Sequence, residues 1–341
     1  MRKTIGFAVF ILLFSSLFIS CKKSNPLEID VSEIKVDLKI KRLDLDLFNF
    51  DFKDSITSIK SLSETYGDFF NLYNYRMIKL GSPQDPGYTA FLREFIGNEM
   101  ILEIKSKTDS VFSNFVPVQN QLEDAFKHYF YYFPNRPVPV ICTCISGFNQ
   151  SVVTSQGVIG ISLEKYLGRD CSFYKIISPP YPAYQSENMH PGKIVSDCLF
   201  AWGITEFPLD GSKHNLLSRM IHQGKIMYFV EAMMPSSPDS IKIGYSQKQL
   251  EWCKNNEAGM WTFLVGNKML YSTKRIDIRR YMDPAPFTTS FGAESPGRSG
   301  VWIGWQIVKA YMQKNPKVTL PELMSNHDYQ RILNHSSYHP E

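Results

Sequence analysis

Residues 137–162 of the chain, PVPVICTCISGFNQSVVTSQGVIGIS, hold two apolar runs on either side of a polar turn. The runs cover 137–146 and 152–162, and Gly157 interrupts the second one. Short apolar runs bounded by turn residues are typical of buried β-strands. We therefore predict a strand–turn–strand unit. Alternation along its first strand should place the sulfurs of Cys142 and Cys144 on one face, as small buried apolar groups.

The segments before this unit change their apolar period along the chain. Apolar and charged residues alternate over 34–40 and again over 43–47, which predicts two half-buried strands with one wet face. Apolar residues then recur at helical spacing, and a proline follows the last helical segment. Three helical segments are therefore expected before the unit: 55–80, 89–107 and 119–133.

After the unit the chain is predicted to be mostly helical. Segment 171–192 is rich in Tyr and Pro and is expected to be an irregular loop. From Lys193 on, apolar stripes at helical spacing predict helices, including one over 214–234 that ends at Pro235.

Two further patterns indicate how these helices begin and pack. Ser246 and Gln249 have the spacing of a capping box. Gly300 and Gly304 in the last long helix indicate close helix packing. No internal repeat or low-complexity linker divides the body. Residues 30–341 are therefore expected to form a single large α+β domain, predominantly α-helical.

The N-terminus has the pattern of an exported bacterial lipoprotein. A short basic start precedes an apolar run over 5–19, and the small residue Ser20 stands directly before Cys21. These are the three parts of a secretory signal, and bacterial lipoproteins are cut before a Cys that carries the acyl chains. We predict a signal peptide over 1–20, lipidation at Cys21 and a lipidated tether over 21–29.

This segment has two other interpretations. A transmembrane anchor is disfavoured, because the apolar run is shorter than the roughly 20 residues that a bilayer core requires. A plain signal peptide followed by an unmodified Cys21 stays open, because Phe18 and Ile19 are bulkier than the residues usual at such sites.

Charge and cysteine count limit the classes of partner and the disulfide pairing that can be expected. The chain has 37 Lys and Arg against 33 Asp and Glu, interspersed along its length, so binding to nucleic acid is not expected. Five cysteines remain if Cys21 is acylated, and an odd number cannot all pair within one chain. At least one of the following is therefore expected to be free or paired between molecules: Cys142, Cys144, Cys171, Cys198 and Cys253.

Motifs of known enzymes are missing from the sequence. It contains no His-Glu-x-x-His, nucleophile elbow, Walker loop or dinucleotide fingerprint. On the helix 214–234, His222 with Arg219 and Lys225 forms a basic stripe that we expect to be a solvated face. Glu231 lies on the apolar side, so a structural ion pair is expected for it. We predict no catalytic residue, no metal site and no cofactor.

The order of several sequence blocks resembles the gliding-motility lipoprotein family called GldB. The main blocks are ISGFNQSVV (145–153), GISLEKYLG (160–168), MIHQGKIMYF (220–229) and PGRSGVWIGWQIV (296–308). Shorter ones lie at 132–134, 234–235, 243–245, 252–253, 270–272 and 284–287. The resemblance covers nearly the whole mature chain.

What this resemblance implies is an envelope lipoprotein of the Bacteroidota that takes part in surface gliding. The implied role is non-enzymatic: the protein would bind protein partners of the gliding apparatus while acylated Cys21 holds it in a membrane. We expect the periplasmic face of the outer membrane, because Lys22 and Lys23 lack the acidic cluster of a surface-export tag.

A fainter likeness to zincin-type peptidases supports an alternative. The predicted helix at 193–202 offers only Asp197 and Cys198 where zincins carry His-Glu-x-x-His, and Gln223 replaces the second-helix Glu. A zincin-like scaffold would therefore be degenerate. The alternative function is a zinc-dependent hydrolase with atypical ligands, drawn from His190, Asp197, His214 and His222. A glycan-binding lipoprotein is a third class, which rests only on Tyr- and Trp-rich loops.

Two aromatic, Pro-containing loops are candidates for partner binding. Rigid aromatic rings bury area at small entropic cost, which favours them in recognition. The alternative is that the same rings fold back onto the core. The candidate residues are Tyr181 and Tyr184 in the first loop and Phe287 and Phe291 in the second.

Overall fold

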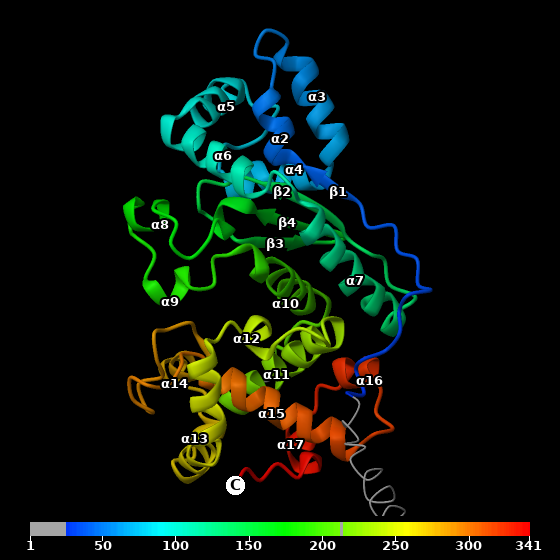
Figure 1. The fold of residues 1–341 in the computed structure, drawn as a ribbon, viewed down its shortest axis with the longest axis vertical. Coiled ribbons are helices and arrows are strands. Elements are labelled where there is room, and N and C mark those ends of the chain that lie inside the picture. Colours follow the sequence, from blue (N-terminus) through cyan, green and yellow to red (C-terminus); the bar gives the residue numbers. More distant parts are fainter. Residues whose placement is uncertain (1–24, 212–213) are drawn as a thin grey trace, which may run out of the picture.

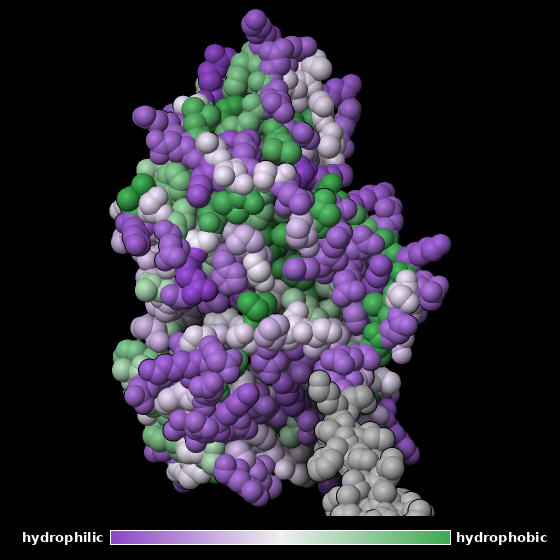
Figure 2. Space-filling model, viewed as in Figure 1, coloured by the Kyte–Doolittle hydropathy of each residue, from purple (hydrophilic) through white to green (hydrophobic). Residues whose placement is uncertain are grey.

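The computed structural model describes residues 25–211 and 214–341 and places a small sheet among many helices (Figure 1). The sheet and the N-terminal helices form the upper half of the view, and helices α11 to α17 form the lower half. On the face shown in Figure 2, hydrophilic residues cover most of the lower half. The fold confirms a predominantly helical α+β protein. The predicted signal peptide, 1–20, and Cys21 lie outside the described residues.

The sheet confirms the predicted strand–turn–strand unit. Its strands stand in the order β1-β2-β4-β3, with β1, β2 and β4 parallel and β3 antiparallel to β4. The second apolar run forms a hairpin, because Gly157 adopts a left-handed φ of 74° and turns the chain between β3 and β4. The strands are β1 Ile40–Arg42, β2 Val140–Cys144, β3 Val152–Ser155 and β4 Val158–Ser162.

Alternation along β2 divides the interior into two clusters. Cys142 and Cys144 belong to the smaller cluster, and Ile141 and Ile145 belong to the larger one. The prediction that both sulfurs point to one face is confirmed. The smaller cluster involves α2 (Leu43–Asp46), α3 (Ser55–Tyr66), α4 (Asp68–Leu72), η2 (Tyr73–Met77) and α5 (Tyr88–Gly97). The larger cluster involves α6 (Glu99–Val111), α7 (Val116–Tyr132) and α10 (Ile194–Glu206).

The prediction of two strands over 34–40 and 43–47 is wrong. Residues 34–39 form neither strand nor helix, because β1 begins only at Ile40, and the second segment is helix α2 followed by the 3₁₀ turn η1, Leu47–Asn49. Leu43 and Leu47 are four residues apart, so one helical face buries both, and Leu45 stays 38% exposed. Asp44 is buried as well, because Arg42 donates to it from Nε at 2.9 Å and from Nη2 at 2.6 Å.

The last residues of the segment predicted as a tether, 21–29, already pack on the folded body. Leu27 is only 8% exposed and belongs to the larger hydrophobic cluster. Val31, two residues beyond the predicted tether, is buried too. Among the described residues, the chain therefore packs on the body from Leu27 onward.

Segment 171–192 is more regular than the predicted loop. It contains the short helices α8 (Phe173–Ile176) and α9 (Ala183–Ser186), and the 3₁₀ turn η4 (Pro191–Lys193) starts within it. The remaining helices are α11 (Leu216–Met233), α12 (Asp239–Ile243), α13 (Gln247–Gly266), α14 (Arg275–Met282), α15 (Ser299–Lys314), α16 (Leu320–Ser325) and α17 (Tyr329–Ser336). None of the described helices combines the length and the apolarity needed to cross a membrane.

Helix α11 is buried on nearly all sides, so the predicted solvated stripe is wrong. His222 is 5% exposed and Lys225 is 1% exposed. The Lys225 ammonium donates to the carbonyl of Met324 at 3.1 Å and to that of Asn326 at 2.7 Å. The end of α16 therefore covers the side of the helix that the sequence pattern left to solvent.

Helices α11 and α15 cross at a very short distance. An added Cβ on Gly304 would lie 1.9 Å from the carbonyl oxygen of Met220, and one on Gly224 would lie 2.2 Å from the carbonyl oxygen of Gly304. The expected close packing at Gly304 is confirmed. Beside the crossing, Lys309 forms the expected ion pair with Glu231 at 3.2 Å.

The five cysteines that follow Cys21 are all buried and unpaired. Burial raises the pKa of the thiols at Cys142 and Cys253 and, further, at Cys144 and Cys198. At least one free cysteine was expected, and the described chain has five.

Candidate functional site

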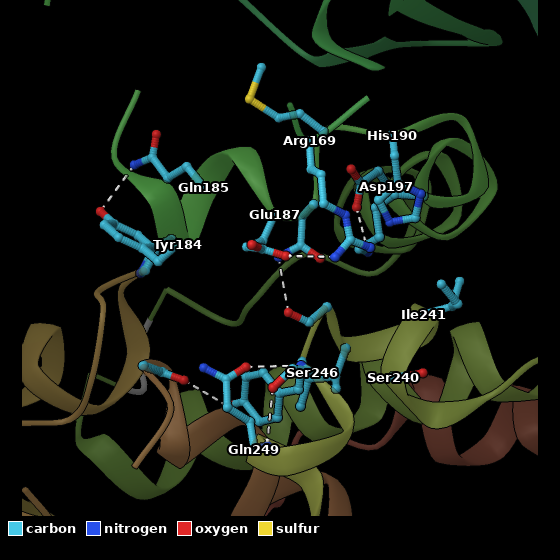
Figure 3. A pocket seen from close by; sticks show the side chains of 18 of the residues that line it. Arg169, Tyr184, Gln185, Glu187, His190, Asp197, Ser240, Ile241, Ser246 and Gln249 are labelled. Atoms are coloured by element: carbon cyan, nitrogen blue, oxygen red, sulfur yellow. Dashed lines mark hydrogen bonds and ion pairs between the residues drawn. The ribbon is translucent and has the colours of Figure 1, made fainter. Parts of the chain in front are cut away.

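A cleft of about 820 Å³ lies between the loop that carries α8 and α9 and the helices of the lower half (Figure 3). One wall comes from residues 165–197, and the other comes from α12, the start of α13 and the segment 284–298. The two aromatic, Pro-containing loops of the sequence analysis cover residues 178–184 and 283–298, and both contribute side chains to this one cleft.

Aromatic stacking holds the first wall on the core. Tyr174 is buried, and its hydroxyl accepts from the Leu167 amide at 2.8 Å. The ring of Tyr181 meets that of Tyr174 edge to face, with centroids 6.0 Å apart. The Tyr181 hydroxyl donates to the carbonyl of Phe148 at 2.8 Å. The loop is therefore a supported wall of the cleft.

The second wall is built by helix ends. Gly244, in the left-handed region at φ 79°, ends α12, and the predicted capping box of Ser246 and Gln249 begins α13. Between them, the buried Tyr245 donates its hydroxyl to the carbonyl of Gly297 at 2.6 Å. Asn188 crosses from the first wall and donates to the carbonyl of Gly244 at 3.0 Å.

A charged network lies at the base of the first wall. Lys193 donates from Nζ to Asp197 Oδ1 at 2.7 Å, and the Tyr166 hydroxyl donates to Asp197 Oδ2 at 2.9 Å. Burial raises the pKa of Tyr166 strongly, with the charge of Asp197 as the next cause. Burial also lowers the pKa of His190, as do the charges of Arg169 and Lys193. A neutral imidazole therefore faces the cleft near neutral pH.

Lys165 is a second, more isolated cation of this wall. It is 8% exposed, its Nζ donates to the Tyr181 hydroxyl, and the same nitrogen lies 4.1 Å from the centroid of the Tyr181 ring. Burial lowers its pKa to about 8, partly opposed by the charge of Glu164. Glu164 is fully buried, which raises the pKa of its carboxyl group, and one of its oxygens accepts from the amides of Ser146 and Phe148.

The structure separates the predicted partner-binding residues. Tyr181 and Tyr184 line the cleft, and Gln185 donates to the Tyr184 hydroxyl at 3.1 Å. Phe291 instead packs against Phe263 and Tyr281, with centroids 5.4 and 5.9 Å away. Phe287 is half-buried and is not among the lining residues. The second loop reaches the cleft through Pro284, Ala285, Gly297 and Arg298.

The alternative zinc ligands are also divided. His190 and Asp197 line the cleft (Figure 3). His222 lies inside the helical half beside Tyr329, and its pKa is lowered to about 4 by burial first and then by the charge of Lys225. His214 is exposed. Within 25–211 and 214–341, no three His, Cys, Asp or Glu side chains converge as a metal-binding group.

Sequence reasoning missed all four cations that line the cleft: Lys165, Arg169, Lys193 and Arg298. One signal for Lys165 is its position in the 3₁₀ turn η3 (Leu163–Tyr166), which follows the carboxyl end of β4, because ligands of α/β sheets commonly bind beyond the carboxyl ends of parallel strands. Arg298 carries no comparable signal, because only the fold brings the segment before α15 to the same cleft.

The fold and the cleft define a predominantly helical α+β protein with a broad, polar, aromatic-lined recess between two supported walls. The family model described as gliding motility protein GldB matches residues 24–340, so the chain belongs to that family, as the sequence blocks predicted. Neither a curated protein nor a solved structure matches the chain.

Proposed function

We propose that this protein is an envelope lipoprotein, held in a membrane by acylated Cys21, that binds protein partners of the gliding apparatus and catalyses no reaction. Membership of the GldB family supports the gliding role. The basic start, the apolar run and Ser20 before Cys21 support the anchor. The body faces the periplasm from the outer membrane.

The cleft is the observation that carries the partner-binding role. Its lining combines Tyr side chains with Asn, Gln, Ser and Arg side chains, a mixture typical of surfaces that recognise other proteins. Tyr184 is half-buried and its hydroxyl accepts only one protein hydrogen bond among the described residues. Its ring is therefore available to a partner without being needed by the core.

The anchor is tested with Cys21→Ala. Wild-type protein should incorporate labelled fatty acid and partition into detergent, and the variant should do neither. Absence of label from the wild-type protein would overturn the anchor.

Partner binding through the cleft is tested with Tyr184→Ala in a gliding host. The variant should abolish gliding while its expression, anchoring and thermal melting match those of wild type. Ile56→Ala is the matched control, because Ile56 is 82% exposed on α3 and does not line the cleft. A Tyr184→Ala protein that is stable, anchored and still supports gliding would exclude the cleft as the partner site.

A zinc-dependent hydrolase is the second candidate function, favoured by His190 and Asp197 lining one cleft. Elemental analysis of the purified protein separates the two functions. We expect no stoichiometric zinc. Zinc at one equivalent, removed by a chelator together with hydrolytic activity, would replace the non-enzymatic proposal.

A further inference from the structure

The cleft has more positive than negative side chains. Its lining contains Lys165, Arg169, Lys193 and Arg298, with only two carboxylates. Glu187 pairs with Arg169 at 3.2 Å, and Asp197 pairs with Lys193 at 2.7 Å. Each carboxylate is thus engaged by one cation, which leaves the other two cations for a ligand.

Lys165 is unusual because a nearly buried ammonium usually has a carboxylate partner. Among the described residues it forms no ion pair, and its hydrogen-bond partner is a tyrosine hydroxyl. The charge of the adjacent Glu164 raises the pKa of Lys165, but the two side chains form no ion pair. One Glu164 oxygen instead accepts hydrogen bonds from the amides of Ser146 and Phe148. A desolvated cation without an ion-pair partner gains most when an anion arrives.

Arg298 faces the cleft from the opposite wall and is held by its backbone. It adopts a left-handed φ of 59° directly before α15, and its guanidinium lies 5.4 Å from the centroid of the Phe200 ring. The preceding Gly297 is fixed by the hydrogen bond from Tyr245, and an added Cβ there would lie 2.1 Å from the carbonyl oxygen of Ala285. No ion pair of Arg298 occurs within the parts of the chain that the structure describes. Its position is therefore preorganised for an anionic group.

The rest of the lining favours a peptide over a small inorganic anion. The amide and hydroxyl groups of Gln185, Ser246, Gln247 and Gln249 line the cleft, and each keeps donor or acceptor capacity beyond the hydrogen bond that it makes within the protein. Such groups can both donate to and accept from the backbone of an extended chain. Tyr184 adds an aromatic surface at the rim, which suits the side chains of a peptide.

We propose that the cleft binds an acidic peptide segment of the partner, whose carboxylates pair with Lys165 and Arg298. This inference rests on the proposed function, because it specifies the chemistry of the partner bound by the same cleft. Lys165 and Arg298 are binding residues in it, and no covalent step is involved.

The experiment measures binding of a dye-labelled peptide, acetyl-(Gly-Glu)₄-amide, to the full chain in detergent by fluorescence anisotropy. The matched peptide acetyl-(Gly-Gln)₄-amide should bind at least tenfold more weakly, because it has no carboxylates to form charge-assisted hydrogen bonds with Lys165 and Arg298. Arg298→Gln and Lys165→Met should each weaken binding of the acidic peptide about tenfold or more. Lys317→Gln, an exposed cation that does not line the cleft, should leave it unchanged.

Several results would overturn the proposal. Equal binding of the two peptides would do so, as would unchanged binding to Arg298→Gln. Because Lys165 is nearly buried, melting of each variant is measured alongside, and Arg298→Gln decides the matter if Lys165→Met is unstable. Binding of anionic phosphatidylglycerol vesicles that depends on the same two residues, without binding of the acidic peptide, would assign the cleft to lipid headgroups instead.

The same variants separate this inference from the proposed function. If Tyr184→Ala abolishes gliding while Arg298→Gln and Lys165→Met support it fully, the cleft binds a partner but not through carboxylates. If all three variants glide, the cleft is not the partner site.

Discussion

The crossing of α11 and α15 offers the sharpest test of how this fold is held together. We expect Gly304→Ala to destabilise the protein, because the new methyl group would lie 1.9 Å from the carbonyl oxygen of Met220. Backbone cannot move aside as a flexible side chain can, so the two helices must separate along their contact. Overpacking of this kind costs about 3 kcal/mol or more at a rigid site. The higher helix propensity of alanine offsets about 1 kcal/mol of this loss. The expected net loss is therefore about 2 kcal/mol or more.

The matched control is Gly259→Ala in the middle of α13. Gly259 is exposed, and an added Cβ would meet nothing within 4 Å. The same substitution should therefore stabilise the protein by about 0.5–1 kcal/mol through helix propensity alone.

Urea unfolding, followed by circular dichroism, measures both variants under one condition. The two midpoints should move in opposite directions, and the stability gap between the variants should reach about 3 kcal/mol. A Gly304→Ala protein as stable as wild type would refute the close approach of the helices. A Gly259→Ala protein that loses as much stability as Gly304→Ala would show that the loss has another cause.

Three further predictions concern buried groups and helix ends. Lys225, whose pKa is lowered to about 8 by burial, binds a proton in the unfolded chain up to about pH 10.4 and in the folded protein only up to about pH 8. The free energy of unfolding that Lys225 contributes therefore rises with pH between about 8 and 10. Urea unfolding should show that the stability of wild type relative to Lys225→Met increases on the order of 2 kcal/mol over that range. A stability difference that does not change with pH would contradict the burial of Lys225. Ser246→Ala should lower the free energy of unfolding by about 1 kcal/mol in the same assay, through loss of the capping box at α13. An unchanged free energy of unfolding would show that the capping box does not stabilise the protein. In a Cys21→Ala background the buried thiols should resist Ellman's reagent in the folded protein and react on unfolding; rapid labelling of the native protein would show that a thiol is accessible.

Local sequence patterns predicted the elements that local chemistry decides. The buried runs around β2 and β4 and the apolar spacing of α7, α10 and α11 all correspond to observed elements. The capping box at Ser246 and the close packing at Gly304 were predictable too, because each depends on residue types at one short spacing.

The errors arose where distant parts of the chain decide the outcome. Leu43, Leu45 and Leu47 satisfy strand alternation, but two of them also satisfy helical spacing, and only packing selects the helix. The basic side of α11 looked solvated because nothing near Lys225 in sequence shows that the end of α16 covers it. The cleft has the same origin: its walls are separated by more than a hundred residues between Lys165 and Arg298. Neither residue forms a motif on its own.

The burial of Leu27 limits how far the protein can stand from its anchor. If Cys21 carries the acyl chains, only the four backbone steps from Cys21 to Asn25 separate the lipid from the described body, and a fully extended chain spans at most about 14 Å over that distance. The body would then behave as a component resting at the membrane surface, without the reach of a long flexible arm. A partner would have to come to the membrane to meet it, and a complex formed there would be confined to two dimensions. Lengthening the segment before Asn25 would loosen that confinement without altering any contact in the fold.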